Sequence, residues 1–266
     1  MSMLDLNGIE KTFNPGSVNQ KKALRGLELH LEEGDFVTVI GGNGAGKSTM
    51  LNAIAGVFPV DKGEIFINNV NVTKLPEHKR AAYIGRVFQD PMMGTCANMQ
   101  IEENLAMASR RGKRPGLRWS SRAKDRAFFQ ERLSMLGLGL EERLTQRVGL
   151  LSGGQRQALT LLMATLKRPD ILLLDEHTAA LDPKTASKVL EITDHIVAEN
   201  GLTTIMITHN MRDAINHGNR LVMLDNGTVA VDIRKEDYPN LSVQDLLQMF
   251  EKASGDAILS DALLLS

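Results

Sequence analysis

The chain has 266 residues, enough for a buried core in one large domain or two smaller ones. With a net charge of −1, one Trp and two Tyr, it lacks the basic field and the aromatic platforms of nucleic-acid binders, so no nucleic-acid partner is expected. Cys96 is the only cysteine, which excludes an internal disulfide and fits a reducing compartment. The first residues lack a signal-peptide pattern, and no apolar run reaches the roughly 20 residues of a spanning helix. We therefore expect another subunit to cross any membrane involved.

Two stretches, residues 1–34 and 58–88, contain short alternating runs of apolar and polar residues. This period of two is typical of strands with one buried face. Asn68-Asn69 follows the apolar run 65–67 and indicates a tight turn. These stretches predict antiparallel hairpins beside the core.

Three short runs consist of apolar and β-branched residues, as expected of buried parallel strands: 36–40, 171–174 and 203–207. Helical patterns lie between them, at 48–55 and at about 183–199, the second closed by Asn200-Gly201. Strands that alternate with helices predict an α/β fold with a parallel sheet.

Residues 92–165 read as a helical insertion. Within it, residues 110–126 hold eight Arg or Lys against one acid, either as a solvated surface or as a contact for lipid headgroups or an acidic partner. Near the end of the chain, Ser242 with Asp245 three residues later predicts a helix over about 242–251.

A glycine-rich loop follows the first buried strand and opens a helix. It reads Gly41-Gly42-Asn43-Gly44-Ala45-Gly46-Lys47-Ser48 and satisfies the P-loop pattern G-x-x-x-x-G-K-[ST]. Its glycines permit backbone angles that turn successive N–H groups toward one anion. Lys47 is predicted to reach the β- and γ-phosphates of ATP and Ser48 to bind Mg²⁺, with Thr49 also in the nucleotide site. The alternative is a flexible glycine turn.

Two acids, Asp175 and Glu176, end the second buried strand. Ligands of open α/β sheets bind at the carboxyl ends of the strands. We expect Asp175 to hold Mg²⁺ and Glu176 to activate the attacking water as general base. An acidic pair at a strand end is otherwise a solvated feature, but this pair follows a P-loop.

A second glycine motif precedes this strand. It reads Leu151-Ser152-Gly153-Gly154-Gln155. The glycines let backbone N–H groups approach a phosphate, Ser152 adds a hydroxyl donor, and the following helix adds its positive N-terminus. The alternative is a loop that caps an ordinary helix.

The order of these motifs resembles the ATP-binding subunits of the ABC transporter superfamily over about residues 3–233. The resemblance implies a P-loop parallel-sheet core with an antiparallel β subdomain and a helical insertion, an ATPase domain over 1–236 and a short tail over 237–266. It implies that Gln89 contacts Mg²⁺ and the attacking water, that Asp182 crosses a dimer interface, and that His209 reaches the γ-phosphate. Phe13 matches the aromatic position that stacks on adenine, with simple packing under the hairpins as the alternative.

The same resemblance implies partners. Two copies would close head-to-tail around ATP, with Ser152, Gly153 and Gly154 facing the other copy's P-loop, beside a transmembrane permease and an extracytoplasmic substrate-binding protein. The chain would lie peripherally at the cytoplasmic face of the membrane.

Import is preferred over export, because the membrane part is a separate chain. Two departures from the usual pattern, His177 after the catalytic acid and the apolar run 158–165, are similar to a branch that serves amino-acid uptake. The alternative class is a soluble ABC ATPase without a membrane partner, such as the iron–sulfur assembly ATPase, against which Leu151 and Gln155 argue.

Overall fold

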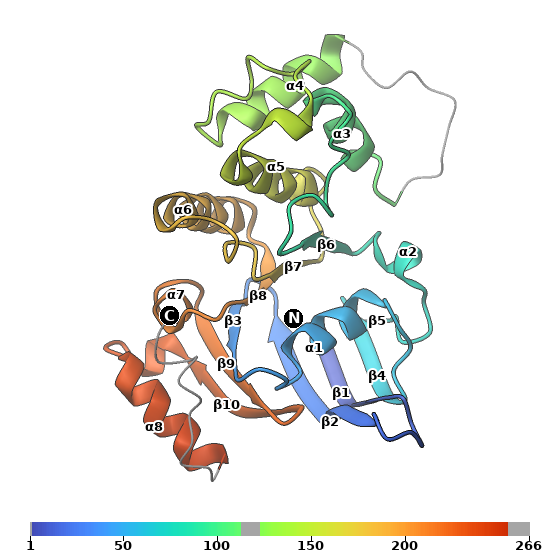
Figure 1. Cartoon of the computed structure of the whole chain (residues 1–266), viewed down its shortest axis with the longest axis vertical. Helices are drawn as coiled ribbons and strands as arrows, with labels where there is room; N and C mark the ends of the chain where they lie inside the picture. Colours follow the sequence, from blue (N-terminus) through green and yellow to red (C-terminus); the bar gives the residue numbers. More distant parts are fainter. Residues whose placement is uncertain (1, 113–122, 255–266) are drawn as a thin grey trace. The chain divides into compact units, whose positions relative to one another are not determined.

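The computed structural model describes residues 2–112 and 123–254 of the chain (Figure 1). These residues form two compact units, called here the first and the second unit. The first unit consists of Met1–Arg80 with Gly201–Ser266, and the second of Ala81–Asn200. Each unit holds part of the predicted functional residues.

The first unit contains an antiparallel sheet with the strand order β2-β1-β4-β5. Its strands are β1 (Ser2–Phe13), β2 (Lys21–Glu32), β4 (Lys62–Ile67) and β5 (Val70–Asn71). Asn68 and Asn69, at φ 48° and 61°, make the predicted turn between β4 and β5 in the left-handed region that Asn tolerates. The predicted antiparallel hairpins are thus confirmed.

The first unit also contains strands β10, β9, β3 and β8, which lie in that order. Strands β3 (Phe36–Ile40), β8 (Thr203–Ile207) and β9 (Arg220–Asp225) are parallel, and β10 (Thr228–Arg234) is antiparallel to β9. Every residue of β3 and β8 is buried, because a parallel strand covered on both faces has no solvent side. The predicted α/β class with a parallel sheet is confirmed.

The helices of the first unit are α1 (Lys47–Ala55), α2 (Glu77–Arg80), α7 (Met211–Asn216) and α8 (Val243–Ser254), with a 3₁₀ turn at Lys235–Asp237. As predicted, α8 begins after Ser242, whose hydroxyl accepts the N–H of Asp245 while the Asp245 carboxylate accepts the N–H of Ser242. Leu246 and Phe250 of α8 pack into a cluster with Ile40, the last residue of β3.

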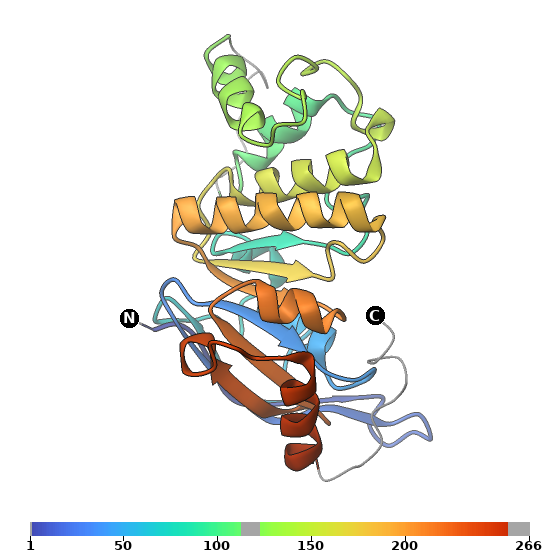
Figure 2. The same cartoon turned by 90° about the vertical axis from the view of Figure 1, so that its left-hand side faces the viewer.

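The second unit contains the parallel strands β6 (Ile84–Val87) and β7 (Ile171–Asp175). Its helices are α3 (Ile101–Ala108), α4 (Ala123–Ser134), α5 (Gly153–Thr165) and α6 (Pro183–Asn200), with a 3₁₀ turn at Val148–Leu150. Helices α5 and α6 lie side by side, as Figure 2 shows. The predicted helices in 92–165 and 183–199 are therefore present.

Most of the basic run 110–126 lies outside the described residues, so its two interpretations stay open. Among the residues described, no helix is both long enough and apolar enough to cross a membrane.

Candidate functional site

The loop between β3 and α1 has a backbone that only glycine fits at several positions. Gly41, Gly44 and Gly46 have φ values of 150°, 84° and 106°. A Cβ on Gly46 would lie 2.9 Å from the carbonyl oxygen of Ala23, and one on Gly41 would collide with the carbonyl of Leu224. The loop is therefore held in one shape by close backbone neighbours, which is what a preformed phosphate cradle requires.

Lys47 and Ser48 lie at the start of α1. Lys47 is buried, and its Nζ donates to the carbonyl oxygens of Gly41 at 2.7 Å and Gly42 at 3.3 Å. The next residue, Ser48, is exposed, as are Asn43 and Gly44 in the loop. The Lys47 ammonium is thus hydrogen-bonded to the loop itself. The Ser48 hydroxyl and the loop backbone face solvent at the positive end of a helix.

Phe13 ends β1 and packs edge-on against the ring of Phe58, with ring centroids 5.2 Å apart. The ammonium of Lys11 lies 5.7 Å from the centroid of the Phe13 ring. Phe13 remains half-buried, so packing and adenine stacking are both compatible with its surroundings.

His209 follows β8 and is exposed. The next residue, Asn210, caps α7 by accepting the N–H groups of Arg212 at 2.8 Å and Asp213 at 3.2 Å. Because the cap fixes where α7 begins, it also fixes the short segment between β8 and α7 that carries His209.

In the second unit, Asp175 ends β7 and its carboxylate pairs with Arg86 of β6 at 3.5 Å. Arg86 is opposite Leu173 in the parallel register, so Asp175 is its diagonal neighbour on the same face. The Arg86 guanidinium also lies 4.6 Å from the centroid of the Phe88 ring. Arg86 was not predicted from the sequence, because its contact with Asp175 depends on the register of two strands far apart in the chain.

Glu176 has a φ of 48°, the left-handed region that costs a non-glycine residue about 1–3 kcal/mol. Its carbonyl oxygen accepts the N–H of Ala179 at 3.0 Å, which closes a turn directly after β7. Neighbouring residues must therefore hold Glu176, the predicted general base, in this strained backbone conformation.

His177 provides one such hold. It is 2% exposed, and its Nε2 lies 3.1 Å from the hydroxyl oxygen of Thr193 in α6. Thr193 donates its hydroxyl hydrogen to the carbonyl of Val189 at 2.8 Å, so Nε2 of His177 is the donor to Thr193. The imidazole thereby tethers the segment after Glu176 to α6.

The signature segment, Leu151–Gln155, opens α5. The Ser152 hydroxyl accepts the N–H of Gln155 at 3.3 Å, and the Gln155 side chain accepts the N–H of Ser152 at 3.2 Å. A Cβ on Gly154 would collide with the Thr185 methyl group of α6. Gly154 therefore has a packing reason to be glycine besides the predicted approach to phosphate.

Asp182 precedes α6, and its carboxylate accepts the N–H of Thr185 at 3.1 Å. The hydrogen bonds from the side chain and backbone of Thr185 lower the pKa of Asp182 below its ordinary value. Thr185 thus contacts both the Asp182 segment and Gly154.

Gln89 follows β6 and is exposed. Two residues of α5 hold its segment. Buried Gln157 donates to the carbonyl of Phe88 at 3.2 Å, and Arg156 donates to the Met92 sulfur at 2.7 Å and to the Leu151 carbonyl at 3.0 Å. Neither Arg156 nor Gln157 was predicted from the sequence. Their signal was weak, a polar pair within a largely apolar helix.

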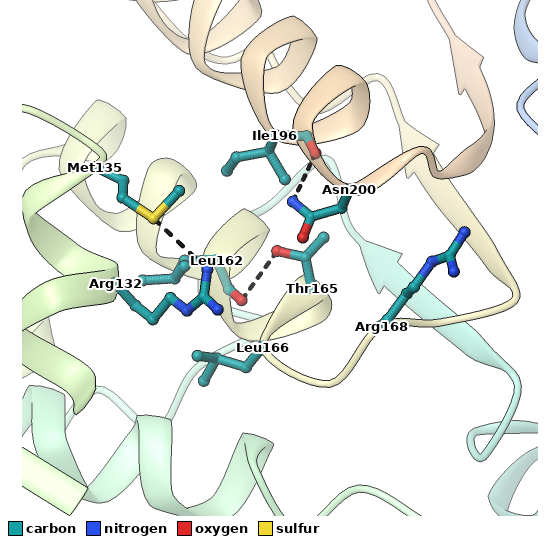
Figure 3. Close-up of a pocket in the computed structure, with 8 residues that line it drawn as sticks. All are labelled: Arg132, Met135, Leu162, Thr165, Leu166, Arg168, Ile196 and Asn200. Carbon is teal, nitrogen blue, oxygen red and sulfur yellow. Dashed lines mark hydrogen bonds between the residues drawn. The ribbon is translucent and has the colours of Figure 1, made fainter.

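A pocket of about 160 Å³ lies among α4, α5 and α6 of the second unit (Figure 3). Its lining consists of Arg132, Met135, Leu162, Thr165, Leu166, Arg168, Ile196 and Asn200, none of them a predicted site residue. Thr165 and Asn200 donate to carbonyl oxygens of their own helices, so these polar groups are satisfied without a ligand. The pocket gains no functional role from this arrangement.

Known proteins share this fold and these motifs. The family model described as ABC transporter matches residues 24–179. The chain is 43% identical over 251 residues to the tyrosine transport ATP-binding protein of Clostridioides difficile (strain R20291), covering 94% of this chain and 100% of that protein. It is 36% identical over 207 residues to the thiamine import ATP-binding protein ThiQ of Chelativorans sp. (strain BNC1), covering 77% of this chain and 79% of that one.

Among solved structures, the dimeric ATP-binding cassette MJ0796 in a post-hydrolysis state with ADP and Pi matches with a TM-score of 0.74 and 30% identity. The match covers 87% of this chain and 98% of that one. The chain therefore belongs to the ABC transporter family, as predicted, and is one of its ATP-binding, ATP-hydrolysing chains.

ATP and Mg²⁺ are the substrate and metal of this family, and the residues present suit both. The glycine cradle with Lys47 fits phosphate, and the Ser48 hydroxyl and Asp175 carboxylate are hard oxygen donors of the kind Mg²⁺ prefers. Mg²⁺, when bound, neutralises charge on the phosphate oxygens. The roles of the individual residues remain predictions.

Proposed function

We propose that the chain is the ATP-hydrolysing subunit of a membrane importer for an amino acid. The observation that carries this proposal is the 43% identity with the tyrosine transport ATP-binding protein, which extends over 94% of the chain. The thiamine import relative supports import over export, and His177 supports the amino-acid branch.

In the proposed chemistry, Lys47 and the loop backbone bind the phosphates, Phe13 stacks on adenine, and Ser48, Asp175 and Gln89 hold Mg²⁺. Glu176 orients the attacking water and accepts its proton, and His209 stabilises the γ-phosphate as negative charge shifts to the leaving oxygen.

Two copies close head-to-tail on ATP, so that Ser152, Gly153, Gly154 and Gln155 of one copy meet the nucleotide of the other, with Asp182 at the interface. The dimeric state of MJ0796 supports this arrangement. Because the γ-phosphate holds the closed dimer together, its removal by hydrolysis releases the two copies.

The partners in this proposal are a transmembrane permease and an extracytoplasmic substrate-binding protein. The chain would lie peripherally at the cytoplasmic face of the membrane. Purification of the tagged chain from detergent-solubilised membranes tests this: a polytopic membrane protein should co-purify. A chain recovered without one would favour a soluble ABC ATPase, such as the iron–sulfur assembly type.

Glu176→Gln tests the catalytic assignment. The amide keeps the size of the side chain but cannot accept the proton, so ATP hydrolysis should fall by about 10²–10⁴-fold while ATP binding persists. Gel filtration with ATP should then show a dimer. A variant that hydrolyses ATP at the wild-type rate would contradict the assignment.

A further inference from the structure

Strand β2 begins beside the phosphate-binding loop. Its first residue, Lys21, is opposite Phe13 in the register of β1 and β2. Farther along β2, the carbonyl oxygen of Ala23 is the close neighbour of Gly46 in the loop. A Cβ built on Gly44 would lie 3.3 Å from Nζ of Lys21 and, apart from its own chain neighbours, would meet no other described heavy atom within 4 Å. The Lys21 ammonium therefore lies beside the exposed Gly44 of the loop.

Lys21 differs from the neighbouring lysines in its charge balance. Lys22 pairs with Glu10 at 3.3 Å, and Lys11 pairs with Asp61 at 3.1 Å. No acid among the described residues lies within ion-pair distance of Lys21, which is exposed. A positive charge that no described carboxylate balances therefore faces the solvent-exposed side of the loop.

We infer that Lys21 is a second phosphate-binding cation of the nucleotide site. The inference rests on the proposed function, in which Phe13 contacts adenine and Lys47 the β- and γ-phosphates. Because Lys21 is opposite Phe13 and lies over Gly44, it serves the α- and β-phosphates, the part of the chain nearer adenosine. A lysine ammonium binds phosphate as a compact point charge with rotatable donors. Lys21 thus strengthens binding and takes no part in cleavage of the γ-phosphate bond.

Lys21→Gln tests the inference in the full-length protein. The dissociation constants of ATP and ADP, measured by calorimetry at low salt, should both rise about threefold to tenfold, as expected for one solvent-screened charge contact. The kcat for ATP hydrolysis at saturating ATP should stay at the wild-type value. Inorganic tripolyphosphate, which has no adenine, should lose the same factor when it competes with ADP. Lys21→Arg should bind like wild type, and the loss should shrink in about 0.5 M NaCl.

Lys22→Gln is the matched control, because it removes the next lysine of the same strand and should leave both dissociation constants unchanged. Equal affinities in Lys21→Gln and Lys22→Gln would overturn the inference. So would a loss confined to ATP, which would assign the contact to the γ-phosphate, or a fall in kcat. Failure of the proposed function itself would give a different result. In that case Lys47→Ala, which removes the lysine of the P-loop, would bind ATP like the wild type.

Discussion

The segments that follow β3 and β7 both leave the carboxyl end of a buried parallel strand, but they are held by different means. The loop after β3 takes its shape from Gly41, Gly44 and Gly46 at positive φ, with Gly41 and Gly46 packed against backbone carbonyls. The segment after β7 has no glycine between residues 175 and 182. It places Glu176 at φ 48°, and side-chain hydrogen bonds hold the residues after Glu176.

The difference follows from the chemistry each segment is proposed to perform. A phosphate is bound by several backbone N–H groups, so the loop must expose its backbone and have no side chains in the way. Water activation needs one carboxylate at one place, so a side chain must be aimed, and we propose that the contact of His177 with Thr193 helps to position Glu176. Substitutions that add a Cβ to a glycine should therefore impair the segment after β3. Substitutions that remove a side-chain hydrogen bond should impair the segment after β7.

The largest effect is expected from Gly46→Ala. Alanine is strained at the positive φ of this position, at a cost of about 1–2 kcal/mol. Its Cβ would also lie 2.9 Å from the Ala23 carbonyl oxygen, so the loop must move. ATP affinity should fall by more than about tenfold. Gly34→Ala is the control, since Gly34 has a φ of 84° but open space around its Cβ position, and it should lose only thermal stability. Calorimetric titration that found equal affinities in these two variants would contradict the contrast.

In the signature segment the expected effect is on hydrolysis and not on ATP affinity. Ser152→Ala removes a helix cap, which costs about 1 kcal/mol of unfolding free energy, and should abolish hydrolysis while ATP affinity of the monomer persists. Ser152→Asp keeps a capping acceptor but repels phosphate, so it should recover the stability and not the hydrolysis.

Ser242→Ala is the control for this pair, because Ser242 caps α8 with the same kind of box and has no proposed role in catalysis. It should lose a similar unfolding free energy and hydrolyse ATP normally. If Ser152→Ala hydrolysed ATP at the rate of Ser242→Ala, the signature segment would have no role in ATP hydrolysis.

The two segments also differ in how far the sequence predicts them. The loop after β3 was predictable, because glycine spacing, Lys47 and a strand of apolar and β-branched residues are local patterns. The partners that hold the segment after β7 were not predictable. Thr193 for His177 and Arg86 for Asp175 lie on other elements, and such contacts depend on helix packing and strand register, which no local spacing reveals.

The same holds for the signature segment. Its helix was predicted from the residues and a helix-capping loop was the alternative reading, whereas the packing of Thr185 against Gly154 depends on how α6 lies beside α5. Local patterns likewise do not indicate that Arg156 and Gln157 hold the segment that carries Gln89.

The smallest effect, and the most specific to this chain, concerns the tether between His177 and Thr193. Thr193→Val is nearly isosteric but leaves the buried Nε2–H of His177 without its acceptor, so unfolding free energy should fall by about 1–3 kcal/mol. The kcat for ATP should fall severalfold with KM unchanged, because Glu176 loses its hold while the phosphate loop does not. Thr165→Val, in a helix where the threonine bonds only to carbonyls of its own helix, controls for the substitution and should keep kcat.

A double-mutant cycle separates positioning from simple stability. His177→Leu with Thr193→Val replaces both polar partners by apolar groups and should regain most of the lost unfolding free energy, because no buried donor is left without an acceptor. If the hydrogen bond positions Glu176, kcat should remain low in the double variant even though the fold is restored. If kcat recovered together with stability, His177 would be only a packing residue. Side-chain hydrogen bonds would then not be what positions Glu176, and the contrast with the loop that glycines shape would not hold.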